Sequence, residues 1–534
     1  MVGVGLTFAH RKYLPLAGIS GGNMKTAHQS QLVSVAGLVM AVALLLAGAR
    51  SLAAQSPEPQ KPASEVQQLK DRLQQLEQTV TDLKGQITAL ETGKKSPPPK
   101  LTEATYSTKT DPAATKPDPP AAIKTDPAGA ATADPAADRA TAVTTPRQQD
   151  PTKVGENSFQ VYGFAMLDVG YQFKQNDPDW FDTVRPTKLP RFGDQFAPSG
   201  NIYLGVRQSR FGAKSTWATT HGELKTIFEF ELFGVGNDVG QTTFRLRHFW
   251  GELGQFGAGQ YWSVLSDTDA FPNTIEYWGP NGLLWYRNVQ FRWMPIKGAN
   301  SLTIGIERPG ASADQGRFAD RIELSNVRAN FDLPDLTANA RFVRSWGHLQ
   351  IGGLLKRVKW VDLIDDDIDL GGSDVGWALS LSGAPKLGPN NVFRFQVTYG
   401  EGYQNYLNDG PVDVAPRFNL GSFDLRRPIE GVALPAFALS TYLDHTWSKR
   451  FTSAFGYSVV NIENSDGQAI DAFHRGHYAS TNLLYTPVEN AMIGGEFIWG
   501  QRRNFHDNFH ADDYRIQFAF KYNFSRVFNN ILDK

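Results

Sequence analysis

Arginine residues recur at alternate positions of several apolar segments, and they carry the most distinctive chemistry of this chain. In one such segment Arg245 and Arg247 alternate with Phe244 and Leu246. A planar guanidinium group binds a carboxylate through two parallel hydrogen bonds, so arginines that face one water-filled space favour anions there. The alternative is that these arginines only neutralise neighbouring acids. The candidate set consists of Arg207, Arg210, Arg245, Arg247, Arg292, Arg341, Arg394 and Arg515.

The elements that must position these arginines are predicted to be β-strands. Near the C-terminus Tyr514, Ile516 and Phe518 alternate with Arg515 and Gln517, which is the two-residue period of a strand. About sixteen such segments follow one another over residues 158–524. Short and long connections alternate between them, as in an outer-membrane barrel with short periplasmic turns and longer external loops. We predict an all-β fold, a transmembrane antiparallel β-barrel whose apolar faces contact lipid.

Ahead of the barrel, an α-helical coiled coil is predicted over residues 62–92. Its apolar residues recur at alternating spacings of three and four, which leaves a narrow stripe that only another helix can cover. Residues 72–77 resemble a short motif of trimeric coiled coils, so a homotrimer is predicted. The expected core residues are Val66, Leu69, Leu73, Leu76, Val80, Leu83, Ile87 and Leu90.

Two further segments flank the predicted coiled coil. The apolar run 33–49, followed by small residues, predicts a signal peptide over residues 1–54, with Met24 as an alternative start. A membrane anchor is the competing interpretation of that run. Residues 93–157 are rich in Pro, Ala and Thr, and this composition predicts a disordered linker.

The overall composition excludes several classes of protein. The chain has 534 residues, 53 Lys plus Arg against 54 Asp plus Glu, and no cysteine. The charge balance excludes a strongly basic nucleic-acid binder, and the lack of cysteine excludes disulfides and thiolate metal sites. A polytopic helical membrane protein is excluded as well, because it needs several apolar runs of about 20 residues.

Four segments, in their order along the chain, carry a resemblance to known porins. They are residues 159–168 (FQVYGFAMLD), 207–214 (RQSRFGAK), 259–263 (GQYWS) and 277–280 (YWGP). The first three are similar to general trimeric porins, and the fourth, with the predicted coiled coil, resembles the DcaP-like porins. This resemblance implies an outer-membrane channel for dicarboxylic and aromatic acids. One departure is that residues 525–534 continue past Phe524, where such a barrel typically ends, so a C-terminal extension is predicted.

The predicted function is a porin for small anionic solutes such as dicarboxylates, located in the outer membrane with its coiled coil in the periplasm. The resemblance implies that the loop after the fifth strand folds into the channel. Its acids Asp267, Asp269 and Glu276 are then expected to face the arginines. No cofactor, metal or nucleic-acid partner is predicted. The acidic segment 362–374 offers oxygen ligands for Ca²⁺, but it lacks the spacing of an EF-hand.

Two other classes of function were weighed against the porin. The first is a structural tether between the outer membrane and the cell wall, with the barrel as an anchor. The second is an outer-membrane hydrolase, which needs a nucleophile beside an oriented histidine. Ser440 and His445 share one predicted strand, but residues five apart in a strand point to opposite faces. An enzyme is therefore not predicted.

Overall fold

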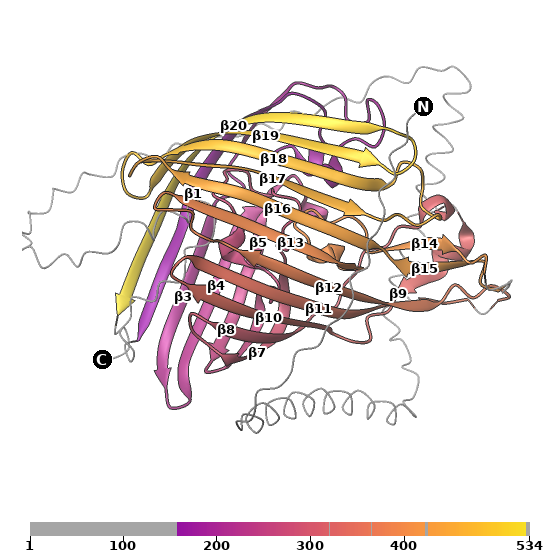
Figure 1. Ribbon diagram of the computed structural model, residues 1–534, viewed down its shortest axis with the longest axis horizontal. Coiled ribbons are helices and arrows are strands. Elements are labelled where there is room, and N and C mark those ends of the chain that lie inside the picture. Colours follow the sequence, from indigo (N-terminus) through magenta and orange to yellow (C-terminus); the bar gives the residue numbers. More distant parts are fainter. Residues whose placement is uncertain (1–156, 320, 365, 422–425, 530–534) are drawn as a thin grey trace, which may run out of the picture. The chain divides into compact units, whose positions relative to one another are not determined.

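The computed structural model describes residues 157–319, 321–364, 366–421 and 426–529. All of them belong to the second of two compact units, Pro127–Lys534, and their strands form a closed antiparallel barrel (Figure 1). The predicted signal peptide, the coiled coil with its core residues, and the linker up to residue 156 lie outside the described residues.

Sixteen strands form the barrel wall, as the alternation predicts. Each strand pairs with its neighbours along the chain, and β1 pairs with β20 from Ser158 with Asn529 to Gln172 with Arg515, which closes the sheet. The strands are β1 (Ser158–Gln172), β3 (Arg210–Thr219), β4 (Gly222–Phe233), β5 (Thr242–Leu253), β6 (Phe256–Trp262), β7 (Arg287–Ile296), β8 (Ser301–Glu307), β10 (Asp335–Arg344), β11 (Gly347–Asp362), β12 (Gly372–Gly383), β13 (Asn391–Glu401), β16 (Pro435–Thr446), β17 (Phe451–Ile462), β18 (Phe473–Tyr485), β19 (Ala491–Asn504) and β20 (His510–Asn529).

Four short strands complete the described sheets. β2 (Asn201–Gly205) pairs with the end of β1, and β9 (Val327–Ala329) pairs with the end of β11. β14 (Val414–Phe418) and β15 (Ile429–Ala433) form a separate two-stranded sheet, and Val414 also forms an isolated bridge with Ala313. The 3-10 helices are η2 (Pro178–Trp180), η3 (Pro186–Lys188), η4 (Gly236–Asp238), η5 (Thr268–Ala270), η6 (Gly316–Phe318), η7 (Ile322–Asn326) and η8 (Gln404–Tyr406). No helix among the described residues is long and apolar enough to cross a membrane.

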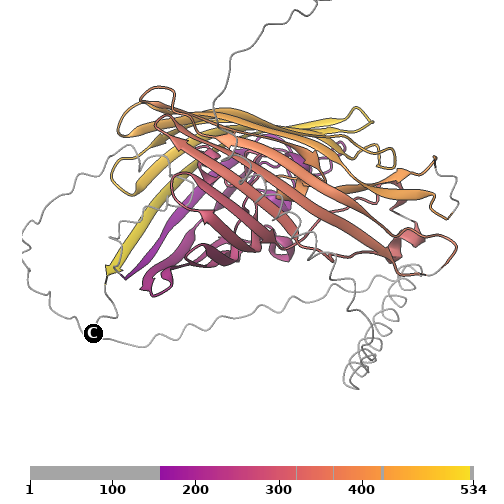
Figure 2. The same ribbon diagram turned by 60° about the horizontal axis from the view of Figure 1, so that its bottom comes forward.

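The connections alternate in length, as predicted. Short turns such as 254–255 and 345–346 lie at one end of the barrel, and the loops 173–200, 263–286 and 402–434 start from the other end. Figure 2 shows the β14–β15 hairpin beyond the rim at that second end. In outer-membrane barrels the short turns face the periplasm and the long loops face outward, so we call the two ends periplasmic and external.

Side chains along each strand alternate between the two faces of the wall. On β20, Phe518 is 59% exposed and Phe520 is 51% exposed, whereas Gln517, Ala519 and Lys521 are at most 4% exposed. The same division of apolar outward and polar inward residues recurs around the barrel. This inverts the pattern of a soluble barrel, because lipid rather than a protein core covers the apolar face.

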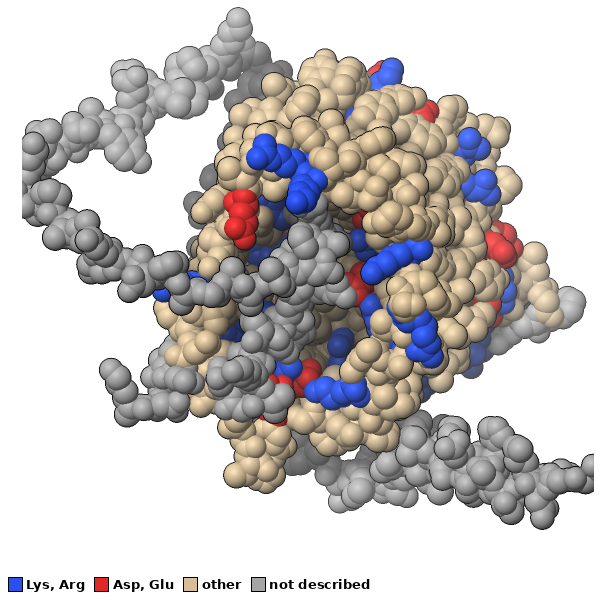
Figure 3. Space-filling model, turned by 60° about the vertical axis from the view of Figure 1, so that its left-hand side comes forward, with Lys and Arg blue, Asp and Glu red and all other residues tan. Residues whose placement is uncertain are grey.

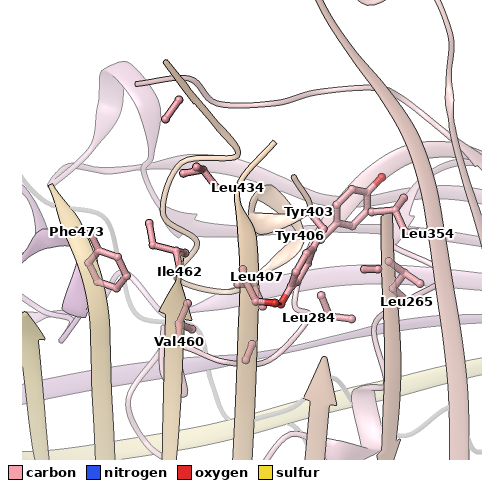
Figure 4. Packing of buried hydrophobic residues seen from close by; sticks show 14 residues of the cluster. Leu265, Leu284, Leu354, Tyr403, Tyr406, Leu407, Leu434, Val460, Ile462 and Phe473 are labelled. Carbon is pink, nitrogen blue, oxygen red and sulfur yellow. The ribbon is translucent and has the colours of Figure 1, made fainter. Parts of the chain in front are cut away.

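The largest cluster of buried apolar side chains lies inside the barrel toward the external end. Tyr403, Tyr406 and Leu407 from loop 402–434 pack there against Leu284 of loop 263–286 (Figure 4). Wall residues, among them Leu354, Val460 and Ile462, complete the cluster. These contacts seat two loops inside the lumen, where they narrow the channel.

The barrel extends beyond the predicted boundary at residue 524. β20 continues to Asn529, and residues 525–529 pair with Tyr162 to Ser158 of β1. Phe528 faces the same side as Phe159, with the ring centroids 6.4 Å apart. The polar pair Ser525 and Arg526 interrupts the apolar pattern at the periplasmic rim. Because of this interruption, the alternation of the sequence predicts an end of the last strand at residue 524 instead of 529.

Ending the chain after Phe524 should weaken the seam of the barrel. The change leaves five residues of β1 without their partners on β20, and unpaired backbone groups at a sheet edge are unfavourable near lipid. We expect the unfolding temperature of the purified barrel in detergent, followed by circular dichroism, to fall by roughly 5 °C. A chain ended after Asn529 is the control, and equal unfolding temperatures for the two chains would contradict the expectation.

Candidate functional site

Two glutamates of β4 organise the arginines of the neighbouring strands. Glu229 and Glu231 are completely buried. Arg247 of β5 reaches both, with its Nε 2.5 Å from Glu229 and its Nη1 2.5 Å from Glu231. Arg210 of β3 lies 3.7 Å from Glu229 and 3.6 Å from Glu231. The two carboxylates lie behind the guanidinium groups and hold them in place.

Two more arginines approach the same carboxylates and shift the local balance to positive charge. Arg245 and Arg287 lie 3.5 Å and 3.4 Å from Glu231, and the hydroxyl of Tyr277 also donates to Glu231. Four guanidinium groups therefore share two carboxylates. Since a protein interior screens charge less than water does, the excess cations attract an anion from the adjoining space.

These arginines line a cavity of about 420 Å³ inside the barrel. Its cationic lining consists of Arg185, Arg210, Arg245, Arg247, Arg287 and Lys521. Seven aromatic residues also contribute, namely Phe164, Trp262, Phe271, Tyr277, Trp278, Trp285 and Tyr286. Among the described residues that line it there is no Asp or Glu. Figure 3 views the periplasmic end of the barrel, where Lys and Arg side chains stand around and within the hollow.

Aromatic rings support the cations around the cavity. The guanidinium of Arg185 lies 4.1 Å from the ring of Trp180 and 4.4 Å from that of Trp278. Arg287 lies 5.1 Å from the ring of Trp262. These cation–π contacts fix the directions of long side chains, in addition to the ion pairs of Arg185 with Asp409 and of Arg287 with Glu231.

Loop 263–286 crosses the lumen and is tied to the opposite wall by Asp267. This buried carboxylate accepts hydrogen bonds from Arg341 of β10 at 2.9 Å, and from Ser382 of β12 at 2.8 Å. His348 of β11 lies 2.7 Å away. Burial opposes ionisation, but the bond with His348 and the charge of Arg341 outweigh it and lower the pKa of Asp267 to about 2. These contacts therefore favour the ionised form of the anchor.

Two further carboxylates accept hydrogen bonds from the middle of the same loop and its neighbours. Glu496 of β19 accepts the backbone N–H groups of Ile275 and Glu276. Glu276 itself accepts the N–H groups of Val184, Trp278 and Gly279. Burial raises the pKa of Glu276 to about 7, although the charge of Arg515 and these amides act against the shift. One carboxylate of the wall and one of the loop thus accept hydrogen bonds from backbone N–H groups of an irregular segment inside the barrel.

A glycine brings the returning part of the loop close to the wall. The N–H of Gly282 donates to Ser458 Oγ at 2.8 Å. A Cβ atom at this position would lie 2.6 Å from the carbonyl oxygen of Leu439, so only glycine fits without displacing the loop.

Two other loops brace this crossing segment. Leu284 pairs with Leu407 of loop 402–434, and the N–H of Asn408 donates to the carbonyl of Leu283 at 2.8 Å. Asp409 then accepts from Arg185 Nε and from the N–H of Thr187, both at 2.9 Å, which joins loop 173–200 to the assembly. Three segments distant in sequence therefore build one constriction.

The structure divides the predicted arginines into three groups. Arg210, Arg245 and Arg247 line the cavity. Arg341 and Arg394 bind the acids or backbone of loop 263–286, and Arg292 donates to the carbonyl of Trp262. Arg207 and Arg515, 1% and 0% exposed, are not on the cavity surface, because loop 173–200 covers them and supplies Asp182 to Arg207 and two carbonyls to Arg515.

None of the acids of loop 263–286 lines the cavity beside its arginines, although two of them meet Arg341, which belongs to the predicted set of arginines. Asp267 and Asp269 both bind Arg341, and Glu276 is enclosed by its amide donors. All three point to the wall because a crossing loop must be anchored there. Asp267, Asp269 and His348 also form the one grouping of metal-ligand type among the described residues, and the guanidinium of Arg341 already neutralises it.

The most informative residues that sequence reasoning missed are Arg185, Arg287, Trp278 and Asp409. Arg287 precedes the alternating part of β7, and the others lie in loops, where no periodic pattern indicates which side chains face the lumen. Ser440 and His445, which their spacing in the strand excludes as a catalytic pair, have different surroundings, since Ser440 is 2% exposed and His445 contacts Asn391.

A closed sixteen-stranded barrel with an inward-folded loop defines an outer-membrane porin fold. The model of the DcaP outer membrane protein family matches residues 136–524, and the chain belongs to this family. The resemblance inferred from the four sequence segments is thereby confirmed. Membership in this family also establishes the outer membrane as the location of the barrel.

Solved structures of porins have a similar fold. The outer membrane channel DcaP of Acinetobacter baumannii is 19% identical and has a TM-score of 0.57, with 70% of this chain and 99% of that chain covered. An anion-selective porin from Comamonas acidovorans is 11% identical, with a TM-score of 0.45 over 69% of this chain and 100% of that chain. No curated protein sequence matches the chain.

Replacing Asp267, which ties loop 263–286 to the wall, should loosen the part of the lumen that this loop narrows. Asp267→Ala leaves Arg341 and His348 without their buried carboxylate, a loss that costs about 3 kcal/mol of stability. We expect noisier and larger single-channel currents in planar bilayers, because the loop is no longer tied to β10–β12. Ser382→Ala removes one hydrogen bond from the same carboxylate and should have a smaller effect. Currents identical to those of the unmodified protein would show that Asp267 does not hold the loop.

Proposed function

We propose that this protein is a passive diffusion channel for small anionic solutes, with dicarboxylic acids among them. This proposal rests on the cavity, whose described lining contains five arginines and one lysine but no carboxylate. In such a space a cation is repelled and an anion exchanges its hydration for guanidinium contacts. The free energy for transport comes from the solute gradient alone.

The geometry of the cations supports a preference for solutes with two acidic groups. Arg210, Arg245, Arg247 and Arg287 stand around the same pair of glutamates, so their outer N–H groups lie close together. A dicarboxylate reaches two guanidinium groups at once, whereas a monocarboxylate reaches one. Glu229 and Glu231 partly neutralise these guanidinium groups, which keeps each individual contact with a solute weak enough for release.

The assembly that we propose is a homotrimer in the outer membrane. Its predicted coiled coil of residues 62–92 would lie in the periplasm and join three chains. Neither cofactor nor metal has a part in this function, and we propose no enzymatic activity.

Removing cavity arginines should reduce anion selectivity. In the double variant Arg245→Ala with Arg287→Ala, two of the four cations that share Glu231 are lost. We expect the ratio of chloride to potassium permeability to fall roughly threefold or more, because the local excess charge disappears. The measurement is the reversal potential across a KCl gradient in planar bilayers.

The control for this experiment is Arg417→Ala. Arg417 lies on the β14–β15 hairpin, pairs with Glu430 and does not line the cavity. Unchanged reversal potentials in the double variant would remove the support for selectivity by these arginines.

Competing solutes test the preference for dicarboxylates. We expect small dicarboxylates to reduce the chloride current of single channels at about tenfold lower concentrations than monocarboxylates of equal length, since a second charge-assisted contact forms. Equal potency would contradict that preference while leaving anion selectivity intact. Closed bilayers at high protein concentration would instead favour a tether without a channel. Conductance that closes in three steps would report the trimer.

A further inference from the structure

The outer face of β17–β20 changes from apolar to polar and charged side chains at the external end of the barrel. Tyr478 reaches Glu276 inside the barrel at 3.3 Å, and Arg502 donates to the carbonyl of Thr187 inside it at 3.1 Å. Because side chains alternate along a strand, their neighbours in sequence point outward. We call these outward residues the twin-arginine patch, which consists of Tyr457, Asn461, Arg475, His477, Trp499, Gln501, Arg503 and Asp512.

The twin-arginine patch lies directly above the apolar belt. The next outward residues toward the periplasm include Phe455 on β17, Phe497 on β19 and Tyr514 on β20, and all three are exposed large hydrophobic side chains. Trp499 and Tyr457 mark the border, as aromatic residues do where the acyl chains of a membrane meet its headgroups. The order of aromatic border and apolar belt therefore places the patch at the depth of the outer-leaflet headgroups. The external ends of the strands that carry it, β18 and β19 among them, lie at the upper right of Figure 1.

Two arginines of the patch oppose each other directly. Arg475 of β18 and Arg503 of β19 are register partners. Like charges in such a cross-strand pair repel each other. Neither arginine forms an ion pair with any carboxylate of the described residues, although both are well ordered by hydrogen bonds. The Nε atoms of Arg475 and Arg503 donate to Asn461 Oδ1 and Gln501 Oε1, each at 2.7 Å.

The remaining groups of the patch do not neutralise this pair. Asp512, its one carboxylate, accepts from Trp499 Nε1 at 3.0 Å and from Gln501 Nε2 at 2.8 Å. His477 lies 2.5 Å from the hydroxyl of Tyr457 and stacks on Trp499, with an angle of 23° between the rings. The amides thus order two adjacent guanidinium groups on the outer face of the barrel, and the carboxylate of the patch pairs with neither of them.

We propose that the twin-arginine patch binds the phosphate groups of the glycolipid that forms the outer leaflet of the outer membrane. Phosphate matches the planar guanidinium fork, and a dianionic group between Arg475 and Arg503 removes their repulsion. The patch lies at the lipid-facing surface and at headgroup depth, where such phosphates are concentrated. This inference concerns the outer face of the barrel and does not depend on what passes through the channel.

Another outward cation pair at the external end provides a matched comparison. Arg357 and Lys359 of β11 both bind Asp332, at 3.3 Å and 2.9 Å. Their charge is therefore partly compensated by the protein itself. If phosphate recognition requires uncompensated guanidinium groups, this second pair should contribute little.

The test uses the full chain in detergent and lipid A as the probe, either with both phosphates or after their enzymatic removal. We expect the double variant Arg475→Ala with Arg503→Ala to bind bisphosphorylated lipid A at least about tenfold more weakly in titrations by native mass spectrometry. Arg357→Ala with Lys359→Ala should bind it like the unmodified chain. Arg475→Lys with Arg503→Lys keeps the charges but loses the forked geometry, and its affinity should lie between the two.

Dephosphorylated lipid A should bind the unmodified chain and the alanine variant equally weakly. If the unmodified chain binds both forms of lipid A alike, the proposal is overturned, and that result does not require any variant to fold. It is also overturned if the alanine variant keeps full affinity for the bisphosphorylated form. Loss of subunit association with unchanged lipid binding would mean that the patch is a contact between copies of the chain, which equally refutes the proposal.

Discussion

Backbone groups that cross a bilayer must find all their hydrogen-bond partners within the protein, and the rest of this structure depends on that constraint. Pairing of β1 with β20 meets it by closing the sheet. Closure then divides every strand into a lipid-facing and an enclosed series of side chains. Because the enclosed series is screened from lipid, charged residues such as Glu229 and Arg247 can be placed at membrane depth. Charged side chains can therefore line the lumen because the pairing of β1 with β20 closes the barrel.

Enclosed charges serve two separate purposes in this barrel. On the β3–β5 side the carboxylates lie behind the arginines, so that cations form the surface of the cavity. On the opposite side carboxylates such as Asp267 and Glu496 accept bonds from the crossing loop or from the wall cations that meet it. The same two residue types thus produce a cationic cavity surface and an anchored loop. The difference lies only in which partner is left facing the open space.

Strand number, wall orientation and family were predictable because alternation and short turns are local features of the sequence. The inward direction of all eight arginines was predictable for the same reason. Which of them reach the cavity was not, since Arg207 and Arg515 are covered by a loop whose path is set by contacts such as Arg185 with Asp409. Those contacts join residues far apart in the chain, and no periodicity marks them. The coiled coil, signal peptide and trimer remain predictions.

Loop 402–434 contains two parts with different surroundings. Its first part, around Tyr406 and Asp409, is enclosed and braces the constriction, while the β14–β15 hairpin extends from the external rim. Phages and antibodies meet a cell at such external hairpins, and neighbouring loops hold this one through the Val414–Ala313 bridge and the hydrogen bond from Ser465 Oγ to the carbonyl of Pro416. Substitutions in the described strands of this hairpin change a surface that does not line the cavity. One continuous loop thereby joins an outer part that is free to vary to an inner part that packing inside the barrel constrains.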